Sequence, residues 1–143
     1  MMDFKVADFA SPEQLASIEL RRRVLRWPLG LDFTPEQLAN EVHELHLVAM
    51  NGDQLLACLV LTPQSKDVIK MRQVAVEPDI QGKGIGRQLV EFSEAVAKEK
   101  GFSKMVLHAR DTAVPFYLRL NYEIEGEPFE EVSIPHRKMV KDI

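Results

Sequence analysis

At 143 residues the chain is long enough to bury a hydrophobic core without disulfides or metals, and we expect one domain over residues 1–143. Hydrophobic residues make up 45% and charged residues 28%, as is usual for a soluble globular protein. The net charge of −4 excludes the basic field of a typical nucleic-acid-binding domain.

The first residues of the chain and its single cysteine indicate the cellular compartment of the protein. The opening stretch MMDFKVADFASPEQ has acidic residues where a signal peptide carries basic ones, and no apolar run approaches the ~20 residues of a membrane span. The only cysteine, Cys58, excludes an internal disulfide, and its run LLACLVL predicts a small buried side chain rather than a nucleophile. We therefore expect a cytoplasmic protein that does not enter a membrane.

Two helix starts come first along the chain. The stretches SPEQ at 11–14 and TPEQ at 34–37 each place a hydroxyl at the N-cap, proline at the first helical position and glutamine at the third. Pro28 and Gly30 are predicted to end the first helix, and the arginine run 21–23 within it is predicted to be a solvated face.

Strands follow, with one crossover helix among them. Asn51-Gly52-Asp53 is a strong hairpin signal, and Gly101 is a natural end for the helix that begins near Gly84. A short helix is predicted over 112–120. The predicted strands are 45–50, 54–61, 67–76, 104–109 and two closing strands in YEIEG and SIPHRKMVK. The strands before and after the crossover helix should be parallel neighbours.

A glycine-rich loop lies where that crossover helix begins. Gly82, Gly84 and Gly86 follow a G-x-G-x-G pattern, which fits neither the dinucleotide fingerprint nor the phosphate-binding P-loop. Glycines still let the backbone approach a ligand closely, and a helix N-terminus points free N–H groups at it. With Lys83 and Arg87 as neighbouring cations, the loop is predicted to bind an anion, and a pyrophosphate fits the number of converging donors.

From residue 45 to the end, the chain resembles the GNAT acetyltransferase family. The family's Q/R-x-x-G-x-G/A signature is present without departure at 81–86, and its later A-x-x-F-Y-x-x-x-G-[FY] segment resembles residues 113–122. The ending PFEEVSIPHRKM is similar to a subgroup related to ElaA. The resemblance implies an α/β (α+β) fold: a mixed, mostly antiparallel sheet with helices on both faces and a V-shaped splay between two parallel strands.

The resemblance also implies acetyl-CoA as co-substrate, with no metal. It assigns cofactor binding to the backbone of the third strand, to the glycine loop and to one tyrosine: Val74, Ala75, Val76, Gln81, Gly82, Lys83, Gly84, Ile85, Gly86, Arg87 and Tyr117. Two positions depart from the family pattern. Asn121 replaces the usual glycine, but asparagine tolerates a left-handed turn. Asp111 replaces a frequent asparagine, and since a carboxylate cannot donate hydrogen bonds we expect it to serve the following helix N-terminus instead.

Four residues are candidates for proton transfer: one acid and three alternative bases. Tyr117 matches the family's general acid, because a phenol is protonated at neutral pH and can protonate a leaving thiolate. The strand 67–76 lacks the carboxylate that some members place there as a base. The candidate bases are therefore His108, Glu131 and His136, with a water chain as the alternative.

The predicted function is acetyl-CoA-dependent N-acetyltransfer to a primary amine of a small molecule or peptide, by direct attack on the thioester. The alternative is a non-catalytic acyl-CoA-binding or sensing domain, and a third reading is an unrelated nucleotide-phosphate binder. Neither nucleic acid nor a membrane is an expected partner, and the closing strands can pair across a homodimer. The acceptor amine is not identified by any sequence pattern.

Overall fold

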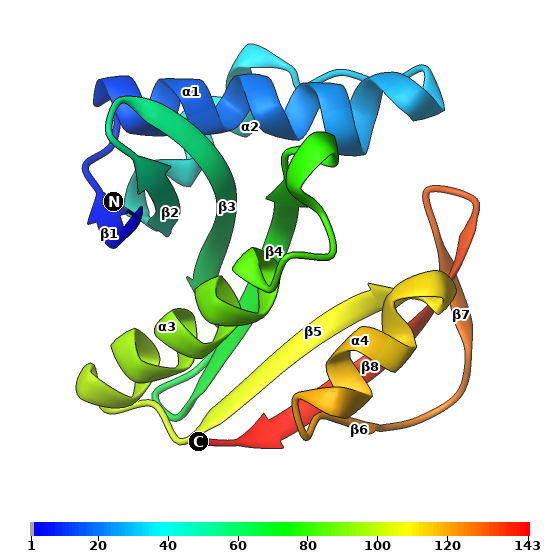
Figure 1. The fold of residues 1–143 in the computed structure, drawn as a ribbon. Coiled ribbons are helices and arrows are strands. Elements are labelled where there is room, and N and C mark those ends of the chain that lie inside the picture. The colour runs from blue at the N-terminus through cyan, green and yellow to red at the C-terminus, as the bar shows by residue number, and fades with distance from the viewer. Residues whose placement is uncertain (1) are drawn as a thin grey trace.

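The computed structural model describes residues 2–143, over which eight strands form one mixed sheet and four α-helices cover its two faces (Figure 1). The strands are β1 (Met2–Ala7), β2 (Leu45–Asn51), β3 (Gln54–Pro63), β4 (Val68–Val76), β5 (Lys104–Arg110), β6 (Glu123–Ile124), β7 (Phe129–Glu131) and β8 (Ile134–Asp142). The helices are α1 (Pro12–Arg21), α2 (Pro35–Ala39), α3 (Ile85–Glu99) and α4 (Val114–Arg119).

The sheet has the order β1-β2-β3-β4-β5-β8-β6, with β7 paired to β8. Only β4 and β5 are parallel, and their pairing runs from Val68↔Lys104 to Met71↔Leu107. Both strands continue past that point, and they diverge in Figure 1. The predicted fold class is confirmed, including the splay between the two parallel strands.

A bulge shapes β4 at the start of the splay. The register with β3 shifts between Cys58 and Val60, so that three steps of β4 match two steps of β3. Gln73 lies in this bulge with a φ of 57°, a left-handed conformation that is uncommon for residues other than glycine. A bulge bends its strand locally, and this one lies directly after the last residue of β4 that pairs with β5.

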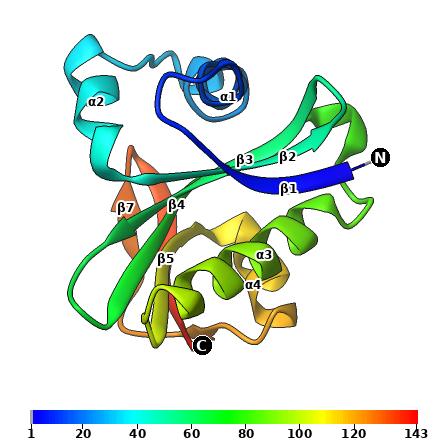
Figure 2. The same cartoon turned by 90° about the vertical axis from the view of Figure 1, so that its left-hand side faces the viewer.

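Helices lie on both faces of the sheet, as Figure 2 shows, with α1 and α2 on one side and α3 and α4 on the other. The larger core lies under α3 and α4, where Leu89 and Val90 pack with Met105. The smaller core lies under α1, where Leu20 packs with residues that include Cys58. Burial raises the pKa of the Cys58 thiol to about 12, in agreement with its predicted structural role.

The predicted turn and cap signals are present. Ser11 and Thr34 each accept a hydrogen bond from the third helical residue, and Thr34 forms a complete capping box. Gly30 ends the first helical segment in the left-handed conformation, after a π-helical turn over Arg22–Arg26. Asn121 also lies in the left-handed region, with a φ of 71°, so the asparagine supports the turn usually made by glycine.

Two strands are absent from the sequence prediction. The first, β1, pairs with β2 at the edge of the sheet, and its apolar residues Phe4 and Val6 alternate with charged ones. The second, β7, has three residues and is formed only by its hairpin with β8. The segment β7 is stabilised by its partner strand rather than by a local pattern, whereas β1 has an alternating pattern over six residues.

The predicted solvated face at 21–23 is wrong for Arg21. Its side chain is fully buried and forms two hydrogen bonds to the carboxylate of Glu41, at 2.9 and 2.6 Å. The guanidinium also lies 4.6 Å from the ring centroid of Phe33. This pair connects α1 to the turn after α2, whereas Arg22 and Arg23 form half-exposed surface pairs.

No helix within residues 2–143 is long and apolar enough to cross a membrane.

Asp111 is exposed, and its side chain makes no capping hydrogen bond in the described part of the chain. Asp111 opens the short 3-10 turn Asp111–Ala113 that precedes α4, so its carboxylate lies near the N-terminal end of this helical segment.

Candidate active site

The glycine loop forms an open N-terminus for α3. Gly82 and Gly84 have φ values of 84° and 86°, and Gly84 is the N-cap residue of the helix. Because the N-cap has no side chain, it cannot accept from the first helical N–H groups, which stay available to a ligand. The side chains of Lys83 and Arg87 lie on the exposed surface beside these groups.

Two other loop residues have packing roles. The Gln81 side chain donates to the carbonyl of Val76 at 3.1 Å and so ties the loop to the end of β4. Gly86 lies inside the first helical turn, where an added Cβ would meet Val76 at 3.4 Å and Phe116 at 3.7 Å. The absence of a side chain at Gly86 brings α3 close to both β4 and α4.

The splay exposes the backbone of β4. Beyond Met71, the edge of the strand that faces β5 has no strand partner among the described residues. Val74, Ala75 and Val76 lie on this segment, and Val74 also lines a cleft of about 440 Å³ between the two strands. Of the three strand residues predicted to contact a cofactor, Val74 therefore lies at the wall of an open cleft, and Ala75 and Val76 follow it on the unpaired part of β4.

Tyr117 reaches the same cleft from α4. Only 7% of the residue is exposed, and its ring packs edge-on against Phe116 and Tyr122. Burial raises the pKa of the Tyr117 hydroxyl, which is therefore protonated at neutral pH. Within residues 2–143 this hydroxyl has no hydrogen-bond partner, so its proton is available to a bound molecule.

The three candidate bases lie together at the wall of the cleft that is formed by β5, β7 and β8. His108 Nδ1 is 3.0 Å from Oε1 of Glu131, and His136 Nε2 is 3.7 Å from Oε2 of the same carboxylate. The ring of Phe129 packs against both imidazoles, with centroids 4.9 and 5.9 Å away. The β5–β8 register, which pairs Arg110 with His136, brings these segments together.

The contacts of His108 define its favoured tautomer. A carboxylate only accepts hydrogen bonds, so the 3.0 Å contact to Glu131 places the proton on Nδ1. Lys70 Nζ lies 3.4 Å from the same nitrogen and acts there as a neighbouring charge. The Nε2 of His108 then carries a lone pair, and it has no partner among the described residues.

Charges around this cluster shift two pKa values. Burial raises the pKa of Glu131, but the hydrogen bond from His108 and the nearby His136 and Lys70 outweigh it, so that the pKa is lowered overall. Burial also lowers the pKa of Lys70. Glu131 is therefore ionised at neutral pH and can stabilise a positive charge on His108.

Several cleft residues were missed by the sequence prediction. Arg26, Arg72 and Arg110 line the cleft, and a second cavity of about 210 Å³ shares Arg26, Arg72 and Gln73 with it. Arg26 comes from the π-helical turn, Arg72 from β4 beside its bulge, and Arg110 from the end of β5. Runs such as KMRQ gave no indication that three arginines from distant segments would converge.

Comparison with known proteins finds a matching family. The family model described as acetyltransferase (GNAT) family matches residues 13–122. YyaT of Bacillus subtilis (strain 168) is 34% identical over 74 residues, which cover 52% of this chain and 50% of YyaT. The chain spans about half the length of the first curated relatives it matches.

Two solved structures share the fold at low sequence identity. Escherichia coli ElaA is 20% identical with a TM-score of 0.79, and the match covers 99% of each chain. A GNAT family acetyltransferase from Elizabethkingia anophelis, solved with acetyl-CoA bound, is 18% identical with a TM-score of 0.74, covering 99% of this chain and 98% of that one. The predicted likeness to ElaA is confirmed at the level of the fold.

Proposed function

The chain belongs to the acetyltransferase (GNAT) family, and we propose that it transfers an acetyl group from acetyl-CoA to a primary amine by direct attack on the thioester. One observation carries the proposal: the unpaired β4 backbone, the Tyr117 hydroxyl and the His108–Glu131 pair meet at a single cleft. These are the groups that an acyl transfer without a covalent enzyme intermediate needs.

The hydrogen-bond donors and cations of the loop and of β4 suit acetyl-CoA. In this proposal the free N–H groups of the loop 82–87 bind the pyrophosphate, and Lys83 and Arg87 add positive charge. The pantetheine arm lies along the unpaired edge of Val74–Val76, where backbone N–H groups face the thioester carbonyl. Donors of this kind stabilise a developing oxyanion by a few kcal/mol each.

His108 is the proposed base. Its free Nε2 takes a proton from the acceptor ammonium, while Glu131 holds the tautomer and stabilises the resulting imidazolium. The neutral amine attacks the carbonyl carbon, and the C–N bond forms as the C–S bond breaks. Tyr117 donates its proton to the departing sulfur and regains one from the attacking nitrogen, which must lose a second proton as the amide forms. The products are CoA thiol and an N-acetyl amine, and His108 releases the ammonium proton to solvent. His136 supports the carboxylate of Glu131 from its other oxygen.

The test is release of CoA thiol from acetyl-CoA in the presence of a panel of primary amines. The proposal expects at least one amine to raise the rate above the amine-free background. Binding of acetyl-CoA without any amine-dependent release would favour the alternative of a non-catalytic acyl-CoA sensor.

Substitution of Glu131 by Gln is expected to lower kcat about tenfold, because an amide no longer favours the imidazolium form of His108. The change is measured by steady-state kinetics with a saturating amine. Glu130→Gln is the matched control, since Glu130 is exposed and lies on the other face of the same short strand. Equal losses in both variants would remove the proposed role of Glu131.

Substitution of Gly84 by Ala is expected to weaken acetyl-CoA binding about tenfold. An alanine at a φ of 86° is strained by about 1–2 kcal/mol, and relief of that strain turns the first helical N–H groups away from the ligand. Gly52→Ala is the matched control, because Gly52 also has a positive φ, 60°, and open space around an added Cβ, but lies in the turn between β2 and β3 away from the glycine loop. Calorimetric titration of both variants with acetyl-CoA measures the difference, and similar affinities would contradict the proposed loop function.

A further inference from the structure

The charges that line the acceptor side of the cleft are unbalanced. Four cationic side chains line the 440 Å³ cleft, whereas Glu131, already engaged with His108, is the one carboxylate among the lining residues. The cations are Lys70, Arg26, Arg72 and Arg110. This local excess of positive charge contrasts with the net charge of −4 on the whole chain.

Two of these arginines have no carboxylate partner. Among the described residues, Arg26 and Arg110 form no ion pair, whereas Arg72 is paired with Glu44 at 3.0 Å. Arg26 stacks on Phe33, and its Nε is buried without a hydrogen-bond acceptor. Arg110 makes one long hydrogen bond of 3.5 Å, from Nη2 to the carbonyl of Leu25.

Clustering these guanidinium groups opposes folding. Burial lowers the pKa of Arg26, and the neighbouring Arg21, Arg72 and Arg110 lower it further. Like charges in a partly buried site destabilise the empty protein, whereas Arg22 and Arg23, on the surface of the same helical segment, have carboxylate partners. An anionic group bound between Arg26 and Arg110 would relieve this repulsion.

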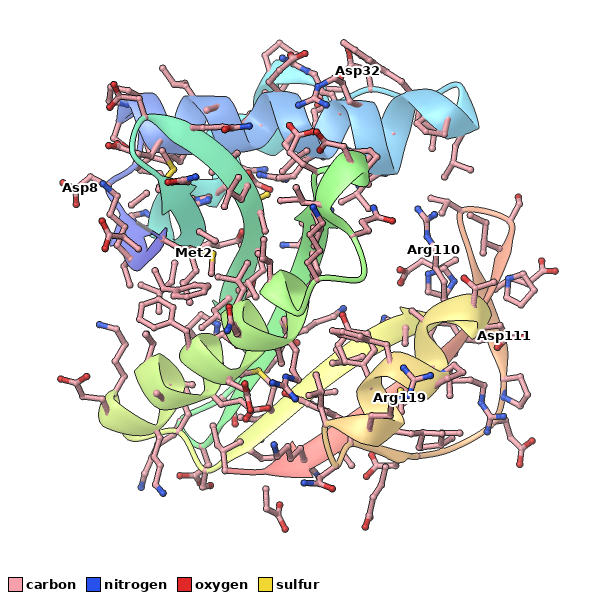
Figure 3. All side chains as sticks on the ribbon, in the orientation of Figure 1. Met2, Asp8, Asp32, Arg110, Asp111 and Arg119 are labelled. Carbon is pink, nitrogen blue, oxygen red and sulfur yellow. The ribbon has the colours of Figure 1, made fainter. Side chains whose placement is uncertain are left out.

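The position of Arg110 relates this charge to the reaction. Arg110 follows His108 by two residues on β5, so both side chains lie on the same face of the sheet. Figure 3 shows Arg110 at the end of β5, beside the β7–β8 hairpin. Arg26 approaches from the π-helical turn, whose Leu25 carbonyl contacts Arg110. A molecule with its amine at His108 therefore has its other end next to both arginines.

We propose that the acceptor is a primary amine that also carries a carboxylate, bound by Arg26 and Arg110 while its amine faces His108. A simple ammonium would meet four cations in this cleft, whereas a zwitterion brings a compensating negative charge. The planar, two-pronged guanidinium matches a carboxylate well. This inference rests on the proposed acetyl transfer.

The test compares amines that differ in their second group: β-alanine and γ-aminobutyrate with a carboxylate, phosphoethanolamine with a phosphate, and propylamine and putrescine without an anion. The carboxylated amines should have the highest kcat/KM. Arg110→Gln and Arg26→Gln should each raise their KM about 10- to 100-fold and leave the KM for acetyl-CoA unchanged. Arg119→Gln is the control, since Arg119 is an exposed residue of α4 (Figure 3).

Each outcome decides between separate claims. If propylamine or putrescine reacts best, the inference fails and acetyl transfer stands; if phosphoethanolamine reacts best, the anion is a phosphate rather than a carboxylate. If no amine reacts, acetyl transfer fails, and binding of γ-aminobutyrate to the CoA-saturated protein still tests the arginine site. In that case, a thermal shift that Arg110→Gln abolishes supports the site, and no shift overturns it.

Discussion

Replacing Tyr117 by Phe is expected to lower kcat about 10²- to 10⁴-fold, the usual effect of removing a general acid. The ring is packed between Phe116 and Tyr122, so phenylalanine fills the same space and only the unpartnered hydroxyl is lost. The thiolate must then leave without a proton. Steady-state thiol release gives kcat, and calorimetric titration should give an unchanged Kd for acetyl-CoA.

The matched control is Tyr122→Phe, which removes a hydroxyl that donates to Glu94 at 2.8 Å, outside the cleft. This variant should lose some stability but keep its kcat. A Tyr117→Phe protein that turns over at the wild-type rate would show that the leaving thiolate needs no acid from this residue. A sensor domain would instead bind acetyl-CoA equally well in both forms and release no thiol in either.

Replacing Glu41 by Ala is expected to lower the free energy of unfolding by about 3–5 kcal/mol, because it leaves the guanidinium of Arg21 buried without its partner. The Arg21 side chain is 0% exposed and that of Glu41 7%, and two hydrogen bonds join them. Urea unfolding followed by circular dichroism measures the loss. Glu41 also lines the 210 Å³ cavity, so the wall beside Arg26 should loosen as well.

The control for this prediction is Glu19→Ala, which removes a half-exposed partner 3.8 Å from Arg23 on the surface of α1. Its cost should stay below about 1 kcal/mol. A double substitution, Arg21→Met with Glu41→Leu, should recover much of the stability, because no charge is then left buried. Equal losses for Glu41→Ala and Glu19→Ala would contradict the assigned importance of the buried pair.

Local signals in the sequence were sufficient for most of the fold. The SPEQ and TPEQ caps, the Asn51-Gly52 turn and the helix start near Gly84 each depend on a few neighbouring residues, and each is present as predicted. The strand β7 escaped prediction because its pairing with β8, rather than its own three residues, stabilises it. The strand β1 was missed although Phe4 and Val6 alternate with charged residues. The β4 bulge at Gln73 has no sequence signature that we could identify.

The candidate site was predictable only in part. His108, Glu131 and His136 were separate candidates, and their assembly into one cluster depends on the register between β5, β8 and β7. The burial of Arg21 depends on a partner 20 residues away. Long-range contacts of this kind cannot be read from helical or strand periodicity, so the cationic lining of the cleft was also missed.

Every proposed step requires acetyl-CoA to occupy the splay between β4 and β5, and a thermal shift tests this requirement most directly. Acetyl-CoA, CoA, ATP and NAD are compared at matched concentrations. We expect acetyl-CoA and CoA alone to raise the midpoint, with a stabilisation of about 2.7 kcal/mol at a concentration of 100 times Kd. An unchanged midpoint with both, or an equal shift with ATP or NAD, would contradict it.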